Sequence, residues 1–451
     1  MINISNRLIS GGVWIGALSL LNAILTLLFN ALLARILNPE EVGQYFIALG
    51  IAMLVATLSL VGTDNSIVRL ISSSLSNKNT YMAKSYLFSS LVFCLLSSFI
   101  VMVGCLFLYF NIEKFVSFFS WDSDLILIIG AWAVVLIFRN IFSSIFKGMH
   151  ELGFASLFSG FVTTFVAIIA LLILYYYGDE YGLNSIVKTV VVCAILATIT
   201  SATVLSRKIK HLYSSYEFRI IELLRVSAPL VFATAGFLIM REVHLWIVGA
   251  KVSSLEVAFL GAAIYLVQFI TVPLRLTNTL IQPAVAHLYA RGKTDRLQVL
   301  LRGTGMVTVV VGIVACFLLL AFGETFLSIV YGEKYAYAID GLNIIILGQL
   351  INVVVGSPGV VLTMAGHEKL VMVSSLSAAG IGITTTYLLS ESMGYLGGAI
   401  GFAVTFASYN LLMWIICLAH LKITTHAGQN EFLILLHEMK KTIKNSTYKL
   451  L

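Results

Sequence analysis

Twelve apolar stretches, each about long enough to cross a bilayer, constrain this chain more than any other feature of its sequence. A spanning helix needs ~20 mostly apolar residues. Stretches of that kind occur at 11–36, 42–63, 82–109, 125–146, 154–177, 183–206, 226–250, 256–278, 300–322, 341–365, 370–390 and 395–420. Because lipid offers the backbone no hydrogen-bond partners, such stretches fold as helices. We therefore predict an all-α integral membrane protein with twelve transmembrane helices, which agrees with a content of 59% hydrophobic and 11% charged residues.

The distribution of lysine and arginine predicts the orientation in the membrane. With the N-terminus inside, 21 of the 28 basic residues fall in cytoplasmic segments, the side on which such residues are retained. Acidic residues such as Glu40 and Asp179 fall in outer loops. We therefore predict that both termini are cytoplasmic. The net charge of +7 reflects a face next to anionic lipid and indicates no nucleic-acid partner.

A weak internal repeat indicates two halves of six helices each. A shift of 215 positions aligns Glu40–Val55 with Leu255–Ile270 and carries Lys78 onto Lys293. Even helix numbers in each half predict parallel repeats with a substrate path between two bundles. The predicted segments are an N-terminal bundle at 1–206, a cytoplasmic linker at 207–225, a C-terminal bundle at 226–420 and a cytoplasmic tail at 421–451. The spacing of apolar residues and lysines in the tail predicts an amphipathic helix on the bilayer surface.

Five motifs resemble the polysaccharide-biosynthesis branch of the multidrug/oligosaccharidyl-lipid/polysaccharide exporter superfamily. They are LLARILNPEEVGQY, APLVF, NTLIQPAVAHLYARGK, IVYGEKYAYA and GYLGGAIGFAVTFASYN. The closest likeness is to O-antigen (Wzx-type) flippases. It implies movement of an undecaprenyl-diphosphate-linked oligosaccharide repeat unit from the cytoplasmic to the periplasmic leaflet of the bacterial inner membrane, for lipopolysaccharide O-antigen or another surface polysaccharide. The expected protein is a transporter without a cofactor, with other polysaccharide-assembly proteins as potential partners.

Arginines inside the apolar helices are the candidates for binding the diphosphate. Arginine suits phosphate because its planar fork binds two oxygens and keeps its charge when dehydrated. We predict Arg275 near the cytoplasmic end of the eighth helix, Arg139 in the inner half of the fourth, Arg241 near the middle of the seventh and Arg35 near the outer end of the first. Arg35, Arg275 and Arg139 can instead extend to the headgroups. Arg241 must either pair with protein or face a watery cavity.

Glu242 and His244 are the candidates for coupling transport to a proton or sodium gradient. Burial raises a carboxyl pKa toward the range in which it exchanges protons. The alternatives are that Glu242 pairs with a cation on another helix and that His244 is a hydrogen-bonded structural residue. Neighbours in a helix point about 100° apart, so Arg241 and Glu242 are expected to be poorly placed to pair with each other.

Three prolines mark expected pivots for alternating access. Pro229 is expected to open the seventh helix, Pro273 to break the inner end of the eighth, and Pro358 to interrupt the tenth. Structural kinks without motion are the alternative.

Two other functions fit the sequence less well. A cation-coupled multidrug antiporter of the same superfamily needs acidic residues within its helices, and this chain has essentially Glu242 and the marginal Asp64. A membrane polysaccharide polymerase or ligase would carry a large outer loop with catalytic residues. The longest outer loop, about Phe110–Asp124, holds no His, Cys or Arg.

Overall fold

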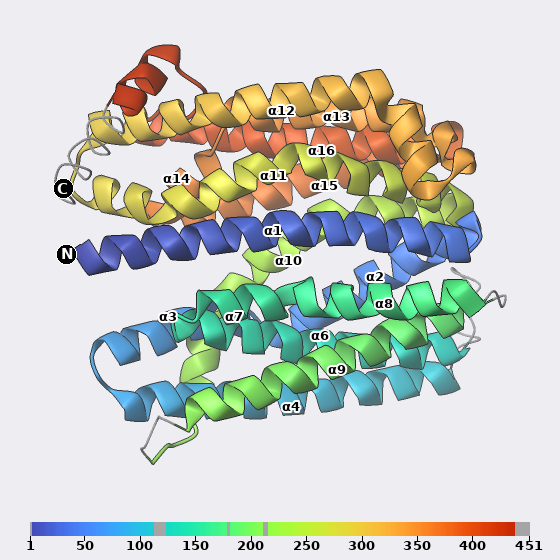
Figure 1. Ribbon diagram of the computed structural model, residues 1–451, viewed down its shortest axis with the longest axis horizontal. Coiled ribbons are helices and arrows are strands. Elements are labelled where there is room, and N and C mark those ends of the chain that lie inside the picture. The colour runs from blue at the N-terminus through green and yellow to red at the C-terminus, as the bar shows by residue number, and fades with distance from the viewer. Residues whose placement is uncertain (1, 112–122, 178–180, 211–214, 438–451) are drawn as a thin grey trace. The chain divides into compact units, whose positions relative to one another are not determined.

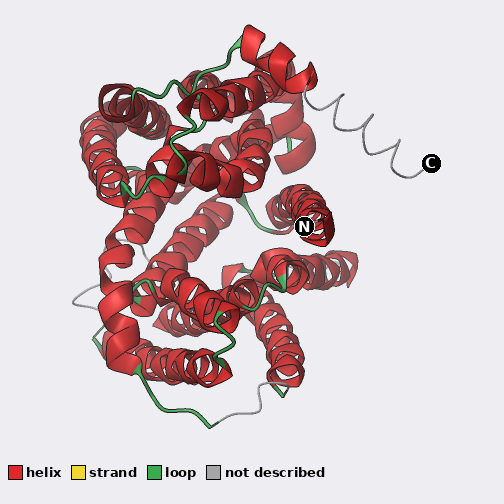
Figure 2. Cartoon of the chain, turned by 90° about the vertical axis from the view of Figure 1, so that its left-hand side faces the viewer, coloured by secondary structure: helices red, strands yellow, loops and turns green. Residues whose placement is uncertain are grey.

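The computed structural model describes residues 2–111, 123–177, 181–210 and 215–437 as helices joined by short loops (Figures 1 and 2). No strand occurs in these ranges, which confirms the predicted all-α class. The helices are α1 (Ile2–Ile36), α2 (Pro39–Leu60), α3 (Thr63–Ser76), α4 (Thr80–Phe110), α6 (Ser123–Gly148), α7 (Leu152–Ser156), η1 (Leu157–Phe161), α8 (Val162–Tyr177), α9 (Leu183–Ile209), α10 (Ile220–Lys251), α11 (Ser254–Ala290), α12 (Thr294–Tyr331), η2 (Glu333–Ala338), α13 (Ile339–Val355), α14 (Pro358–Met364), α15 (Glu368–Met393), α16 (Tyr395–Ile416) and η3 (Cys417–Leu421).

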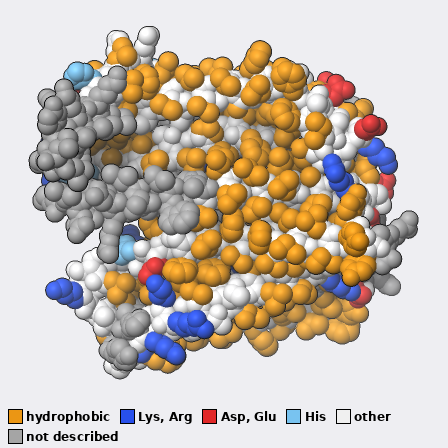
Figure 3. Space-filling view, viewed as in Figure 1, with side chains coloured by type: hydrophobic (Ala, Val, Ile, Leu, Met, Phe, Trp, Pro, Cys, Tyr) orange, Lys and Arg blue, Asp and Glu red, His pale blue; other side chains and the backbone are white. Residues whose placement is uncertain are grey.

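Eleven helical segments in the described ranges are long and apolar enough to cross a membrane. Figure 3 shows hydrophobic side chains over the middle of the helices and most of the visible charged side chains toward the helix ends. The seventh predicted span, 226–250, lies within helix α10 but is not among the eleven. A multi-pass helical membrane protein is therefore established, while the count of twelve spans and the cytoplasmic termini stay predictions.

The linker between α9 and α10 is shorter than predicted. Helix α9 continues to Ile209 and α10 begins at Ile220, so helix occupies both ends of the predicted linker 207–225. Pro229 therefore lies inside α10 and does not open it, which corrects the prediction. Lysines and arginines lowered the hydropathy of these helix ends without ending the helices, since both residue types favour helix.

Pro273 does not end its helix either. Helix α11 continues through Pro273 and Pro283 to Ala290, beyond the predicted end at 278. Proline removes one backbone hydrogen bond, and a membrane helix tolerates that loss. The prediction of a break is correct at Pro358, because α13 ends at Val355 and α14 starts at Pro358.

Contacts divide the chain into two compact units, Met1–Gly261 with Val330–Lys334, and Ala262–Ile329 with Tyr335–Leu451. In the first unit, α6 packs against α2, α3, α4 and α9, and α10 packs against α2, α3 and α4. Helix α10, assigned by the repeat to the C-terminal bundle, thus packs with N-terminal helices. The repeat and its two bundles stay predictions.

Helix α3 is an element that the hydropathy pattern missed. Its serine-rich sequence is too polar for a membrane span, but Ile67 and Ile71 lie one turn apart and are fully buried. The turn before it places Val61 and Gly62 in the left-handed region, with φ of 48° and 74°. The chain therefore reverses sharply after α2, and α3 packs along α4 and α6.

Glu41 connects the first turns of two helices in the first unit. Asn38 caps α2 by accepting the Glu41 N–H at 3.0 Å, and a Glu41 oxygen accepts the Asn38 N–H at 3.2 Å. The other Glu41 oxygen accepts the Leu183 N–H at 3.1 Å, in the first turn of α9. A carboxylate at two helix N-termini satisfies exposed donors and complements both helix dipoles.

In the second unit, α16 packs against α13 and α15. The break after α13 is covered by the chain that follows α16. Gly356 has φ of 82°, and a Cβ there would lie 2.4 Å from the Thr425 carbonyl oxygen, so only glycine fits. The Thr425 hydroxyl donates to the Val355 carbonyl oxygen at 2.8 Å. The backbone group freed by the break is thus satisfied inside the protein.

The tail forms a helix over 429–437 within the described residues. Arg302 of α12 pairs with Glu431, and a Cβ on Gly303 would lie 3.3 Å from Cβ of Leu435. Leu433 and Ile434 are exposed. The predicted helix is therefore confirmed in this range and packs on α12, while its contact with the bilayer stays a prediction; residues 438–451 lie outside the described residues.

We expect Gly43→Ala to lower the free energy of unfolding by about 3 kcal/mol, the upper end for overpacking. A Cβ at Gly43 would lie 1.8 Å from the Ser254 carbonyl oxygen, and this backbone atom cannot rotate away. Thermal unfolding of the purified protein in detergent measures the effect. Gly104→Ala is the matched control, since a Cβ there meets no atom within 4 Å. Equal melting temperatures for the two variants would contradict the close approach.

Candidate functional site

Arg241 and Glu242 form an ion pair in helix α10, contrary to the expectation from the helical angle between them. The Arg241 Nη2 and Nε atoms each lie 2.6 Å from Glu242 Oε1. The long arginine side chain bends around the helix, so its guanidinium reaches a neighbour whose Cβ points elsewhere. The Arg241 side chain is 32% exposed, whereas that of Glu242 is 3% exposed. The pair therefore has a buried anion and a half-buried cation.

Helix α2 forms one wall around this pair. Arg241 Nη2 lies 3.4 Å from the Met53 sulfur. A Cβ on Gly50 would lie 3.3 Å from Glu242 Oε2 and 2.8 Å from Trp246 Nε1. The absence of a side chain at Gly50 thus leaves room for both residues. Sequence reasoning missed this wall, although Gly43 and Gly50, seven positions apart on one face of a helix, are the signal of close helix packing.

His244 is fully buried and hydrogen bonds to the backbone of Met240 one turn earlier. Arg241, three residues away, is half-buried. This arrangement is that of a structural histidine, the alternative weighed from the sequence. A coupling role for His244 stays a prediction.

Arg139 lies in the interior of α6, between neighbouring turns that pack inward. Ser143, one turn later, donates to the Ala155 carbonyl oxygen of α7 at 3.0 Å, and Trp132 packs against Tyr45. The Arg139 Nε atom is buried and has no hydrogen-bond acceptor among the described residues. A buried arginine donor without an acceptor is costly, so Arg139 remains a candidate for an anionic ligand.

Arg275 and Arg35 are exposed. The Arg275 Nη2 atom donates to the Gln268 carbonyl oxygen at 3.3 Å, two turns back along α11. Because α11 continues to Ala290, Arg275 lies within the helix and not near its end, which corrects the predicted position. Arg35 lies in the last turn of α1, and the location of that helix end on the outer side stays a prediction. The four arginines belong to four different helices, and their role in diphosphate binding stays a prediction.

Asp64 lies in the first turn of α3, outside the eleven candidate spans. Burial raises the pKa of its carboxyl group, an effect opposed by hydrogen bonds to the backbone of Asn65 and of Asp64 itself and by the positive charge of Lys147. From hydropathy alone, Asp64 was placed at the edge of the predicted span 42–63, because helix α3 was not predicted.

Comparisons with known proteins identify the family. The fold is that of a helical multi-pass membrane protein with paired charges inside its helices. A family model described as polysaccharide biosynthesis protein matches residues 8–288, more than half of the chain. A second model, described as MatE, matches residues 229–388. The chain therefore belongs to the polysaccharide biosynthesis protein family. A search of curated proteins gave no match.

Solved structures of membrane transporters have a fold similar to that of this chain. An inward-facing MATE multidrug resistance transporter superposes with a TM-score of 0.72 at 12% identity, covering 87% of this chain and 93% of that one. A MOP superfamily transporter from Pyrococcus furiosus, whose title reports a binding pocket of reversed polarity, gives 0.66 at 12% identity, covering 91% and 94%. The lipid II flippase MurJ, in an inward closed conformation, gives 0.64 at 16% identity, covering 93% and 89%.

We expect Arg241→Ala to lower the free energy of unfolding by about 3 kcal/mol, because it leaves the buried Glu242 carboxylate without its cation. The double variant Arg241→Ala/Glu242→Gln removes that charge and is expected to be more stable than the single variant. Thermal unfolding of both variants in detergent checks this order. A double variant that is less stable than Arg241→Ala would show that the ion pair does not determine the stability of this region.

Proposed function

We propose that the protein is a flippase that moves an undecaprenyl-diphosphate-linked oligosaccharide from the cytoplasmic to the periplasmic leaflet of the bacterial inner membrane. The product would serve the synthesis of O-antigen or another surface polysaccharide. The observation that carries this proposal is the family match over residues 8–288 together with the half-buried Arg241 inside α10. The twelve spans, the cytoplasmic termini and alternating access belong to the same proposal.

An anionic cargo accounts for the charges that the helices contain. Moving a diphosphate through a ~30 Å hydrocarbon layer without compensating charge is prohibitively costly. The guanidinium of Arg241 supplies a fixed positive group that binds phosphate oxygens with directed hydrogen bonds. In this proposal Glu242 is a positioning residue: it holds the guanidinium in one orientation through two contacts of 2.6 Å.

The Glu242 pair also bears on ion coupling. Glu242 Oε1 is bound by Arg241, so a proton or sodium ion would have to compete with the guanidinium for that oxygen. The arrangement thus supports a positioning role for Glu242 more directly than a coupling role. Coupling of transport to a proton or sodium gradient remains part of the proposal, with no residue assigned to it by geometry.

A cation-coupled multidrug antiporter is the second candidate. The MatE match over residues 229–388 favours it, as does the fold shared with a MATE transporter. The paired state of Glu242 argues against it, because an antiporter needs an acidic residue that can exchange cations. Drug susceptibility of cells with and without the protein separates the two candidates: resistance without an effect on surface polysaccharide would identify the antiporter.

We expect Arg241→Ala to reduce transport of the lipid-linked oligosaccharide about tenfold or more, since a hydrogen bond to a charged group contributes about 1.5–3 kcal/mol. Surface polysaccharide in a strain that lacks the native gene measures this at equal membrane abundance of the variants. Arg225→Ala is the control, because Arg225 is an exposed arginine near the start of the same helix. Full transport by Arg241→Ala would remove the assigned role.

We expect Glu242→Gln to lower the transport rate while its dependence on the proton gradient is unchanged, because the substitution loosens Arg241 without removing a coupling site. Rates in vesicles with an imposed pH gradient, with and without an ionophore, measure this dependence. Transport that no longer responds to the gradient would instead assign ion coupling to Glu242.

A further inference from the structure

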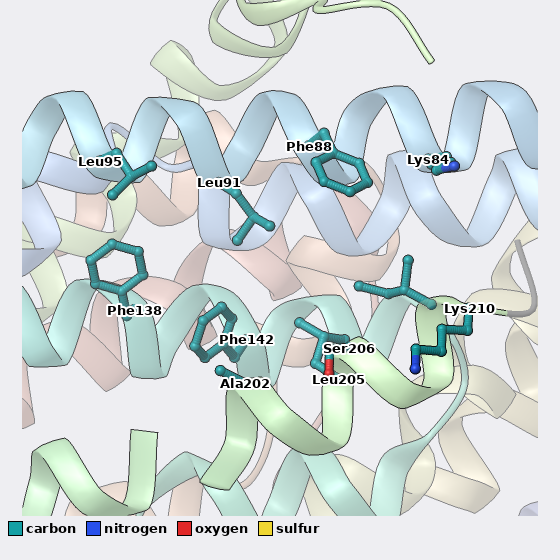
Figure 4. Close-up of a pocket in the computed structure, with 11 residues that line it drawn as sticks. Lys84, Phe88, Leu91, Leu95, Phe138, Phe142, Ala202, Leu205, Ser206 and Lys210 are labelled. Atoms are coloured by element: carbon teal, nitrogen blue, oxygen red, sulfur yellow. The ribbon is translucent and has the colours of Figure 1, made fainter. Parts of the chain in front are cut away.

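An apolar groove lies on the first unit between helices α4, α6 and α9. Its volume is about 770 Å³. Figure 4 shows that Lys84 and Lys210 lie toward one end, whereas Leu95 and Phe138 lie toward the other. The lining residues of α4 recur at helical spacing, so one face of that helix forms one side of the groove. These residues are Lys84, Phe88, Leu91 and Leu95.

The groove opens on a surface suited to contact with lipid tails. Leu95 at its apolar end is 60% exposed, and Leu96 and Phe99 beside it are 54% and 69% exposed. On α9, Leu196 and Ile199 are likewise exposed. Large exposed apolar side chains on membrane-spanning helices contact hydrocarbon, so a lipid tail can enter the groove from the side.

Two lysines give the other end of the groove a positive charge. Lys84 lies over the ring of Tyr216 at 5.5 Å from its centroid, and Lys210 is exposed at the end of α9. Both lie in segments predicted to be cytoplasmic. An anionic headgroup is the complement of this pair, and the cytoplasmic leaflet is rich in anionic lipid.

The length of the groove matches one leaflet. Lys84 and Leu95 are eleven residues apart in α4, which corresponds to about 16 Å along the helix axis. Half of a ~30 Å hydrocarbon core is about 15 Å. The acyl chain of a phospholipid spans that depth, whereas an undecaprenyl chain is much longer than the groove.

We propose that this groove binds an anionic phospholipid of the cytoplasmic leaflet. Its phosphate lies between Lys84 and Lys210, and one acyl chain lies against Phe88, Leu91 and Phe142. The site is separate from Arg241 and does not depend on the identity of the transported substrate.

Lipid in the groove would also stabilise residues 215–219, which precede α10. Tyr216 stacks on Phe88 with ring centroids 4.4 Å apart and an interplanar angle of 12°. The N–H groups of Glu217 and Arg219 donate to the Ser85 and Ser89 hydroxyl oxygens at 3.1 and 2.7 Å. Residues 216–219 therefore contact α4 beside the groove, and a lipid that orders Phe88 and Lys84 would also order these residues.

The carboxyl group of Glu222, in the first turn of α10, also connects to α4. Tyr86 of α4 donates to it at 2.6 Å, and Arg219 lies 3.1 Å away. The Tyr86 hydrogen bond, followed by that of Arg219, lowers the pKa of Glu222. The hydrogen bond from Tyr86 therefore holds the start of α10 against α4.

The test uses the full-length protein in nanodiscs that contain a phosphatidylglycerol with a photoreactive group in its acyl chain, diluted in phosphatidylcholine. Mass spectrometry of the crosslinked peptides identifies the site. We expect crosslinks at the α4, α6 and α9 residues that line the groove. Crosslinks confined to other helices would overturn the proposal, as would equal labelling by a photoreactive phosphatidylcholine.

Substitutions then test the contribution of the lysines. We expect Lys84→Ala/Lys210→Ala to reduce crosslinking in the groove at least fivefold, and Lys84→Arg/Lys210→Arg to retain it. Lys293→Ala/Lys369→Ala removes two exposed lysines of the second unit and is the charge-matched control. If the double alanine variant does not fold, Lys210→Glu changes only an exposed residue and must show the same loss. Unchanged crosslinking in the Lys210→Glu variant would overturn the proposal. Preferential displacement of phosphatidylglycerol from the groove by undecaprenyl phosphate would also overturn it.

Discussion

The structure depends on the need of every backbone N–H and C=O group inside a bilayer to find a partner within the protein. Continuous helices meet this need along most of the chain, and the exceptions show how strictly it is met. At the break after α13, the Val355 carbonyl oxygen accepts the Thr425 hydroxyl. At the starts of α2 and α9, Glu41 accepts two backbone N–H groups. At these places a polar side chain satisfies backbone groups that the helix leaves without a partner.

The same constraint governs the ionisable side chains. Glu242 is almost fully buried and is bound by Arg241, whose side chain keeps partial exposure. A pair of this kind satisfies the carboxylate while leaving the guanidinium accessible on one side. Because a buried carboxylate needs a cation beside it, Glu242 holds the Arg241 guanidinium in place. A binding site for an anionic lipid headgroup requires a guanidinium held in this way. The local charge of the pair is neutral, so directed hydrogen bonds would contribute more to recognition than net charge.

Hydropathy and turn chemistry predicted much of the fold, since length and apolarity determine whether a segment can cross a bilayer. The break at Pro358 was predicted from local sequence, whereas the Asn38–Glu41 capping box was not predicted. Helix α3 escaped notice because its buried face consists of only a few residues between serines. The extents of α10 and α11 were also missed. Helix α10 begins within the charged sequence before residue 226, and α11 continues through Pro283 to Ala290.

The candidate site was predicted in its residues but not in its contacts. Arg241 and Glu242 stood out as charges in an apolar helix, whereas their pairing depends on side-chain flexibility that an angle between Cβ directions does not capture. The contribution of Met53 and Gly50 required knowledge of which helix packs against α10, a relationship between segments about 190 residues apart. Local pattern cannot supply such a relationship.

The shared carboxylate of Glu41 has a mechanical consequence. One side chain is bonded to the first turns of both α2 and α9. Separating those two helix starts would therefore break a hydrogen bond to the Glu41 carboxylate. A rearrangement within this unit that keeps both bonds would displace the opposite ends of the two helices more than their first turns.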